Sequence, residues 1–204
     1  MVAYTEASKS RYNGVDGIEA HIALAIAETN MAYQKSGIQT NLNLVHTTLV
    51  SYSESGNMGT DLSRITSKTD GYMDSIHALR DTYGADTVTL IEEEPTYCGI
   101  AWLMTSLSSG FSANAFSVVH SSCATGYFSF AHELGHNMGS THDHANAGSG
   151  LFLDSFGYQD PNNSFRTVMA YNCPGGCSRV QHFSNPSITY NSKVTGIADL
   201  ADNA

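Results

Sequence analysis

Residues 132–143 read HELGHNMGSTHD, a stretch with three histidines, one glutamate and two glycines. Residues four apart lie on the same face of a helix, so His132 and His136 can present two imidazoles to a single point. Gly139 is the residue type that can take a left-handed conformation and end such a helix. The chain can then reverse and bring His142 back to that point. This stretch therefore predicts a helix, a tight turn and a group of three histidines.

Three converging imidazoles are a ligand set for one Zn²⁺ ion. Three protein ligands leave the fourth position for water, which is typical of a catalytic zinc site and not of a structural one. Glu133 lies one step around the helix, beside that position. A carboxylate there can take a proton from the water and pass it to a leaving amine. We therefore expect Glu133 to be catalytic and not to bind the metal.

The pattern is specific because Gly139 and His142 follow the common motif HExxH at fixed offsets. One alternative is that these are ordinary histidines of a surface or core helix. Another is a zinc domain that has lost catalysis, which is expected to have lost the glutamate as well. The glutamate is present, and this favours an active site.

At these positions the sequence resembles the metzincin metallopeptidases. Their HExxHxxGxxH signature matches at His132, Glu133, His136, Gly139 and His142. Residues 167–171 (TVMAY) look like the methionine turn of this family, which implies that Met169 lies under the zinc. Taken alone, Met169 would be an ordinary core methionine.

Two further residues carry marks of different branches of this family. Asp143 directly follows the third histidine, as in the adamalysin (reprolysin) branch, where a buried aspartate anchors the methionine turn through hydrogen bonds. A solvated loop aspartate is the alternative. Tyr171, two residues after Met169, is similar to the tyrosine of astacins and serralysins, which can reach the zinc or the tetrahedral intermediate. The resemblance thus implies that Tyr171 is a second catalytic residue.

The resemblance also implies how substrate is bound. Metzincins pair the substrate antiparallel with an edge strand of the sheet. We assign this role to Phe116, Ser117, Val118, Val119 and His120, and an interior strand is the alternative. The segment after the methionine turn lines the pocket for the residue that follows the scissile bond. It contains Arg179 and His182, and a buried arginine there would select Asp or Glu, as in a bacterial peptidyl-Asp type of metallopeptidase. We favour the alternative, in which Arg179 points to solvent and the pocket accepts medium or large apolar residues, because sequence cannot fix the direction of one side chain in a Gly-rich loop.

The hydrophobic pattern predicts an α+β fold. Alternating helices and strands indicate an α/β lobe with a mixed, mostly parallel, twisted sheet. The predicted elements are helices at 17–35, 61–83 (kinked or restarted near Gly71) and 127–138, and strands at 40–52, 86–92 and 116–120. Residues 144–196 are rich in Gly, Asn, Ser, Pro and Asp, which indicates an irregular lobe. We expect one catalytic domain over 1–204, with an N-terminal subdomain (1–143) and an irregular C-terminal subdomain (144–204).

Four cysteines suit two disulfides and an oxidising compartment. Cys173 and Cys177 bracket Pro-Gly-Gly, so a short loop can join them, and a Cys-x3-Cys zinc site is the alternative. Cys98 and Cys123 are then left to pair with each other. No signal peptide is visible, and we expect a precursor to have carried the export signal and a pro-segment.

The formal charge is −10 with nine Lys and Arg, which provides no electrostatic surface for nucleic acid or an anionic membrane. Together with the histidine motif, the cysteines and the family resemblance, this charge leads us to expect a secreted, monomeric zinc endopeptidase that acts on protein or peptide substrates. A catalytically silent adhesion or recognition module and a zinc hydrolase for non-protein substrates are the alternatives. Calcium stays open, because residues 158–163 (YQDPNN) offer oxygen ligands without the spacing of a calcium loop.

Overall fold

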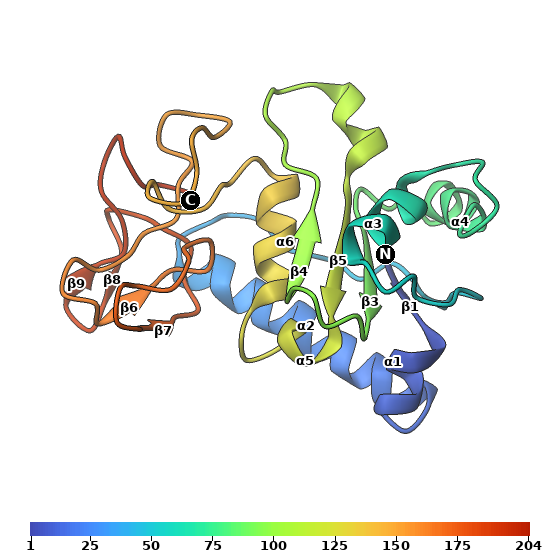
Figure 1. Ribbon diagram of the computed structural model, residues 1–204. Helices are drawn as coiled ribbons and strands as arrows, with labels where there is room; N and C mark the ends of the chain where they lie inside the picture. Colours follow the sequence, from blue (N-terminus) through green and yellow to red (C-terminus); the bar gives the residue numbers. More distant parts are fainter.

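A five-stranded sheet forms the centre of the computed structural model, which describes residues 1–204 (Figure 1). The strand order is β2-β1-β3-β5-β4, and only β4 is antiparallel to its neighbour. The strands are β1 (Val2–Tyr4), β2 (Thr47–Leu49), β3 (Val88–Glu92), β4 (Gly99–Ala101) and β5 (Phe116–His120). The predicted mixed, mostly parallel sheet in an α+β protein is confirmed.

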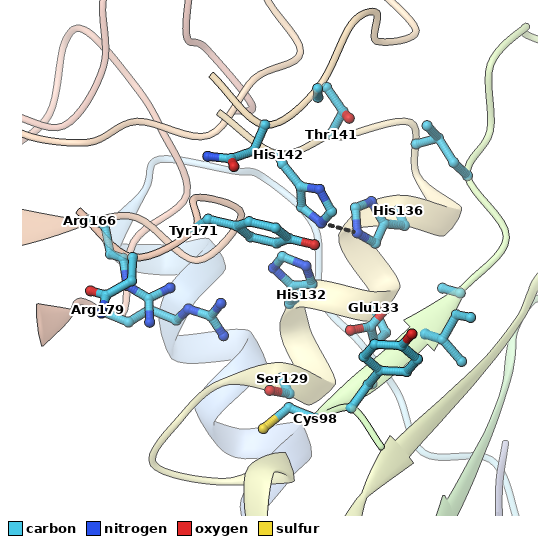
Figure 2. Close-up of a pocket in the computed structure, with 18 of the residues that line it drawn as sticks. Cys98, Ser129, His132, Glu133, His136, Thr141, His142, Arg166, Tyr171 and Arg179 are labelled. Carbon is cyan, nitrogen blue, oxygen red and sulfur yellow. Dashed lines mark hydrogen bonds between the residues drawn. The ribbon is translucent and has the colours of Figure 1, made fainter. Parts of the chain in front are cut away.

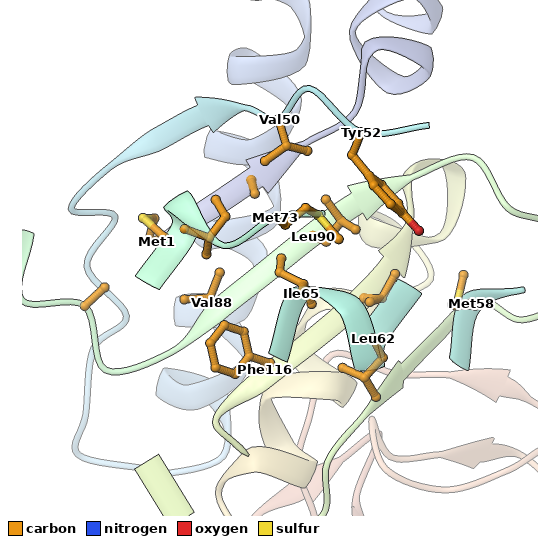
Figure 3. Close-up of a cluster of buried hydrophobic side chains, with 14 residues drawn as sticks. Met1, Val50, Tyr52, Met58, Leu62, Ile65, Met73, Val88, Leu90 and Phe116 are labelled. Atoms are coloured by element: carbon orange, nitrogen blue, oxygen red, sulfur yellow. The ribbon is translucent and has the colours of Figure 1, made fainter. Parts of the chain in front are cut away.

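Helices cover both faces of the sheet because alternate strand residues point to opposite sides. On one face, Val88 and Leu90 of β3 and Phe116 of β5 pack against Leu62 and Ile65 (Figure 3). The helices of this face are α3 (Met58–Thr66) and α4 (Ser75–Tyr83). They replace the predicted helix over 61–83, and the break around Gly71 confirms that the helix restarts there.

The opposite face carries the long helix α2 (Val15–Lys35) and the helix α6 (Ser129–Asn137). Ile18 and Ile22 of α2, Ile91 of β3 and Leu134 of α6 belong to one buried cluster. Two short helices lie near the ends of the strands, α1 (Glu6–Arg11) and α5 (Ser121–Ala124). The predicted helices at 17–35 and 127–138 are therefore confirmed, with small shifts at their ends.

The sheet corrects one prediction that bears on substrate binding. The strand 116–120 is not an edge strand, because β5 lies between β3 and β4. Phe116, Ser117, Val118 and Val119 are fully buried, so they cannot contact a substrate. The edge on this side is β4, which is only three residues long. The predicted strand at 40–52 is also shorter than expected, since only Thr47–Leu49 pairs with β1.

The chain from residue 144 onward is largely irregular, as predicted. It contains four two-residue strands: β6 (Phe165–Arg166), β7 (Ser178–Arg179), β8 (Thr189–Tyr190) and β9 (Lys193–Val194). A six-residue 3₁₀ helix, η1 (Ser109–Asn114), precedes β5 in the N-terminal part. None of the helices combines the length and hydrophobicity needed to cross a bilayer.

Both predicted disulfides are present, Cys98–Cys123 and Cys173–Cys177. The alternative of a zinc site at Cys173 and Cys177 is therefore wrong. The first bridge connects the residue before β4 to helix α5, and the second closes a loop next to β7. The first disulfide thus fixes a segment that lines the cavity described below, and the second closes a loop between two residues that line it, Asn172 and Arg179.

Candidate metal and catalytic site

Helix α6 ends at a tight turn, and the backbone conformation of this turn requires the glycine of the motif. Gly139 has φ +92°, in the left-handed region, and its N–H donates to the carbonyl of His136 at 3.0 Å. The next N–H, of Ser140, donates to the carbonyl of Gly135 at 2.9 Å. This pair of bonds is the Schellman arrangement that ends helices at glycine. The turn sends the chain back across the helix, as the sequence predicted.

The turn brings the three predicted histidine ligands together (Figure 2). The Nε2 atoms of His136 and His142 are 3.1 Å apart, and one nitrogen of each of the three rings lies within 4.8 Å of the others. Three nitrogens around one tetrahedral zinc ion are expected to lie about 3.3 Å apart. The group could therefore hold a metal ion with little movement.

Backbone carbonyls orient two of these rings. Nδ1 of His132 lies 2.8 Å from the carbonyl oxygen of Val168, and Nδ1 of His136 lies 2.9 Å from that of Ser140. A carbonyl only accepts, so each Nδ1 carries the hydrogen and each Nε2 keeps its lone pair. This is the tautomer that metal-binding histidines need when Nε2 is the ligand.

Burial keeps the three rings neutral at physiological pH. It lowers the pKa of His136 to about 4 and that of His132 well below its usual range, and the neighbouring imidazoles lower both further. The pKa of His142 is also lowered by burial, although Asp143 opposes the shift. Neutral imidazoles can donate their lone pairs to a cation without first releasing a proton.

Glu133 lies on the cavity side of α6, beside the histidines but outside the group that could bind a metal. Its side chain is buried against the backbone of β4 at Gly99. Burial raises the pKa of Glu133 to about 8, and the positive charge of Arg179 partly offsets this rise. A carboxyl group with a pKa near neutrality can both accept and release a proton.

The segment 167–171, which resembles a methionine turn, packs against helix α6, as the resemblance implied. Met169 is fully buried, and a β-carbon on Gly135 of α6 would lie 2.5 Å from its sulfur. Only a glycine at position 135 therefore allows the turn to approach the helix this closely. The same turn supplies the Val168 carbonyl that orients His132.

Asp143 joins the histidine loop to the residue after the methionine turn. It is buried, and its carboxylate accepts hydrogen bonds from the N–H of Tyr171 at 2.9 Å and from that of Ala145 at 3.2 Å. The side-chain amide of Asn146 donates to both carboxylate oxygens. The solvated alternative for Asp143 is therefore wrong.

Tyr171 reaches over the histidines from this anchored segment. Its ring centroid is 4.1 Å from that of His142, and Figure 2 shows its hydroxyl directed toward the space between the three imidazoles. Burial and the charge of Glu133 raise the pKa of Tyr171. The phenol therefore stays protonated and can donate a hydrogen bond.

These groups share one cavity of about 910 Å³ between the sheet and the C-terminal part of the chain. One wall is the segment Tyr97–Ala101, which includes β4. The floor is α6 with His132, Glu133 and His136, and the opposite wall contains Tyr171, Arg166 and Arg179. A cleft between two parts of a chain is where active sites usually lie.

Two arginines at one end of the cavity share Tyr127. The Arg179 guanidinium lies 4.6 Å from the centroid of the Tyr127 ring and donates to the Tyr127 carbonyl at 3.0 Å. Arg166, which is 3% exposed, donates to the Tyr127 hydroxyl at 2.9 Å and to the carbonyl of Ala170 at 2.6 Å. The tyrosine thus holds the two guanidinium groups side by side.

Neither arginine has an acidic partner. The four ion pairs of the structure involve other residues, and the Nε atoms of Arg166 and Arg179 are buried without a hydrogen-bond acceptor. Burial and the charge of Arg166 lower the pKa of Arg179 to about 10. Buried cations are usually paired, so this end of the cavity favours an anionic group from a ligand.

The sequence model described as "Metallo-peptidase family M12B Reprolysin-like" matches residues 1–202. The chain belongs to the reprolysin-like metallopeptidases. This confirms the predicted family and its adamalysin or reprolysin branch, which the buried Asp143 had indicated.

Two curated relatives are both named peptidyl-Asp metalloendopeptidase. The protein from Xanthomonas campestris pv. campestris is 42% identical over 204 residues, and that from Stenotrophomonas maltophilia is 41% identical over 207 residues. Each match covers 100% of this chain but 47% and 48% of the two relatives, so the chain spans about half their length.

A solved structure described as "Structure of a chaperone-substrate complex" has the same fold as this reprolysin-like chain. Its TM-score is 0.75, with 18% sequence identity over 99% of this chain and 31% of that chain. At this identity the likeness concerns the fold alone.

In this reprolysin-like site, some predicted residues lie elsewhere. His182 was expected to line the substrate pocket, but it is not among the residues that line the cavity, and its ring packs against Tyr190. His120 lies at the end of β5, 3.8 Å from Glu93, and is also absent from the cavity wall. Arg179 does line the cavity, as predicted.

Other residues of the site were missed from sequence. Gly99, Tyr127 and Arg166 all line the cavity or hold a residue that does. Arg166 could have been recognised from sequence, because it is one of only nine Lys and Arg residues and lies three positions before Met169. No sequence feature pointed to Gly99 or Tyr127, since their roles depend on segments that are distant in sequence.

Proposed function

We propose that this chain is the catalytic part of a zinc endopeptidase that cleaves protein chains before acidic residues. The observation that carries the proposal is the group of three neutral imidazoles with Glu133 beside it in one cavity. The relatives named peptidyl-Asp metalloendopeptidase support the same activity.

Zinc fits the ligand set better than a hard cation, because imidazole nitrogens suit Zn²⁺ whereas Ca²⁺ and Mg²⁺ prefer oxygen. His132, His136 and His142 would hold the ion through Nε2, with Nδ1 of the first two fixed by carbonyls. When bound, zinc supplies Lewis acidity and lowers the pKa of a water molecule toward neutrality.

Glu133 is the base in this mechanism. Its carboxylate accepts the proton of the water that attacks the peptide carbonyl, and then passes this proton to the leaving nitrogen. Because Glu133 is buried, its charge is poorly solvated, and this favours acceptance of the proton. Tyr171 donates a hydrogen bond toward the oxygen that becomes negative in the transition state.

The free edge of β4 binds the substrate backbone. The segment Tyr97–Ala101 lines the cavity, while the other edge of β4 pairs with β5. An extended peptide that adds to this edge gains main-chain hydrogen bonds whatever its sequence. The proposal thus keeps the predicted mode of binding but transfers it from residues 116–120 to β4.

Arg179 and Arg166 bind the acidic side chain that follows the scissile bond. A carboxylate placed between the two guanidinium groups would give them the anionic partner that the protein itself lacks. An apolar side chain would leave both cations unpaired, so it is rejected. This argument favours the acidic preference over the apolar pocket that the sequence alone favoured.

Two disulfides support an extracellular location, since such bonds persist in oxidising compartments. The proposal includes a monomeric enzyme that is made with a pro-segment and acts on proteins or peptides without nucleic acid or membrane as partner. Within it, residues 1–143 supply the zinc helix and residues 144–204 supply the methionine turn and the arginines.

A peptide-library digest tests the proposal. Wild type should cleave before Asp or Glu, lose activity in a chelator and regain it with added zinc. Arg179→Ala should lose the acidic preference, whereas Arg11→Ala, a change at an exposed arginine paired with Glu93, should keep it. Absence of turnover in wild type with zinc bound would support a silent binding module instead. Cleavage without preference for acidic residues would contradict only the specificity.

A further inference from the structure

A second cavity adjoins the one that contains the histidines. It has a volume of about 500 Å³, and Gly148 and Ser149 line both cavities. Its apolar wall consists of four large side chains, Leu151, Phe152, Leu153 and Phe156. The proposed active site is therefore continuous with an apolar surface that the proposed mechanism does not use.

The apolar wall does not belong to the core of the protein. None of its four residues is part of the four buried hydrophobic clusters. Leu153 is 90% exposed and Phe152 is 54% exposed, although both side chains are large and apolar. Adjacent apolar side chains that are left in water beside a cleft mark a binding surface.

Contacts with the turn after the zinc helix hold the apolar wall in place. A β-carbon on Gly139 would lie 2.4 Å from Cδ2 of Leu151, and the N–H of Leu151 donates to the Gly139 carbonyl at 3.4 Å. The N–H of Phe152 donates to the hydroxyl of Ser155 at 2.9 Å. The wall is thus anchored to the same turn that brings His142 back, so its position relative to the histidines is fixed.

The apolar wall and the two arginines lie at different ends of the active-site cavity. Figure 2 shows Arg166 and Arg179 on one side of the three imidazoles and Thr141 on another. Gly150 lies next to Thr141, since a β-carbon on this glycine would be 3.1 Å from Cγ2 of Thr141. In the proposed function the arginines bind the side chain that follows the scissile bond. The part of the substrate that precedes this bond therefore extends toward Thr141 and the apolar wall.

We propose that the apolar wall is a second specificity site, which binds a large apolar side chain of the substrate upstream of the scissile bond. This inference rests on the proposed function, because the arginines give the direction of the substrate. The enzyme then recognises Leu, Phe or a similar residue several positions before the acidic one. Contact of this residue with Phe152 and Leu153 removes apolar surface of both partners from water, which stabilises the complex.

A series of peptides tests the upstream preference. Each peptide keeps Asp after the scissile bond, and Leu or Ser is placed at one of the second to fifth positions before it. At one of these positions Leu should raise kcat/KM of wild type roughly 10-fold over Ser, as expected when a leucine side chain is partly buried. The double variant Phe152→Ser/Leu153→Ser should lose most of this ratio but keep kcat/KM for the Ser peptides. Leu107→Ser, at a 71% exposed leucine outside both cavities, is the matched control and should keep the ratio.

Peptide binding gives a readout that does not depend on turnover. By calorimetry, zinc-loaded Glu133→Gln should bind the preferred Leu peptide roughly 10-fold more tightly than its Ser counterpart. Adding Phe152→Ser/Leu153→Ser to this protein should remove the difference in Kd.

Two outcomes would overturn the inference alone. One is equal kcat/KM and equal Kd for the Leu and Ser peptides while cleavage before Asp is retained, which would indicate that the apolar wall binds a partner other than the substrate. The other is a preference for Leu only after the scissile bond. A wild type without preference for Asp would instead contradict the proposed specificity, and the Kd ratio would still decide whether the apolar wall binds the leucine.

Discussion

Gly99 of β4 lies directly against Glu133 of α6. A β-carbon on Gly99 would fall 2.5 Å from a carboxylate oxygen of Glu133 and 2.8 Å from its carboxyl carbon. The edge strand that we propose for substrate binding is thus also the surface that positions the proposed base. The Cys98–Cys123 disulfide holds the start of this strand. The backbone of Gly99 therefore limits how far the Glu133 side chain can move from the proposed substrate-binding edge.

Gly99→Ala should displace Glu133 and lower kcat by roughly 10- to 100-fold, because small shifts of a catalytic group have effects of this size. KM and zinc content should change little, since the substrate-binding edge and the histidines are kept. Steady-state kinetics and metal analysis measure this. Gly110→Ala, in the exposed 3₁₀ helix η1, is the matched control and should be silent. Unchanged kcat in Gly99→Ala would contradict the positioning role.

Glu133→Gln removes the proposed base but none of the three histidine ligands. We expect kcat to fall by roughly 100- to 10,000-fold, as when a general base is lost. Zinc content and Tm should be retained, or Tm should rise, because a buried carboxyl group is replaced by a neutral amide. Near-full turnover in this variant would show that another group takes the proton.

The helix, the turn and the three histidines could be predicted from sequence because their geometry is local. The spacing of His132 and His136 and the conformational freedom of Gly139 are properties of a single turn of chain. The disulfides were predictable because four cysteines, two of them in a short loop, leave few pairings.

The edge strand could not be predicted because strand order is a long-range property. The run at 116–119 is apolar apart from Ser117, which is typical of an interior strand, whereas β4 has three half-buried residues and no pattern. The proximity of Arg166 to Arg179 could not be predicted for the same reason, since it also depends on which strands pair. Their strands, β6 and β7, are joined in the fold but 13 positions separate the two residues (179 minus 166).

Tyr171→Phe should lower kcat while KM and zinc content stay the same. The hydroxyl is directed toward the histidines, so a hydrogen bond from it acts on charge that develops in the transition state. The loss of one such donor corresponds to roughly a 10- to 100-fold change, somewhat below the effect of an oxyanion-hole donor. Steady-state kinetics at saturating and limiting substrate separate kcat from KM. Equal kinetics for the two proteins would mean that Tyr171 only packs against His142.

The two disulfides should differ in their effect on stability. Cys98 and Cys123 are 25 positions apart and Cys173 and Cys177 only four, so the first bridge restricts the unfolded chain more. Replacing Cys98 and Cys123 by serine should lower the free energy of unfolding by about 1.5 kcal/mol more than replacing Cys173 and Cys177. Denaturant titration of the two double variants measures this. A larger loss from the short loop would indicate that local strain, and not chain entropy, dominates.

Arg166 should determine specificity together with Arg179, although it is more deeply buried. Arg166→Lys keeps the charge but loses the planar fork that binds both Tyr127 and a carboxylate. We expect kcat/KM for a peptide with Asp after the scissile bond to fall by roughly 10- to 100-fold, the equivalent of one charge-assisted hydrogen bond. For the matched Asn peptide, kcat/KM should change much less. Arg64→Lys, at a half-buried arginine that stacks on Tyr72 outside the cavity, is the control.

The double variant Arg166→Lys/Arg179→Ala distinguishes a shared carboxylate site from two independent effects. If both guanidinium groups bind the same carboxylate, Arg166→Lys should reduce the Asp preference less in the Arg179→Ala protein than it does in wild type. The losses from the two single substitutions would then not add up to the loss in the double variant. If Arg166 only supports Tyr127, then Tyr127→Phe should reproduce the Arg166→Lys phenotype in full, because it removes the hydroxyl that receives the Arg166 hydrogen bond. If Arg166→Lys leaves the ratio of kcat/KM for the Asp and Asn peptides unchanged, Arg179 is the sole determinant of the acidic preference. Losses that add would mean that the two arginines act independently.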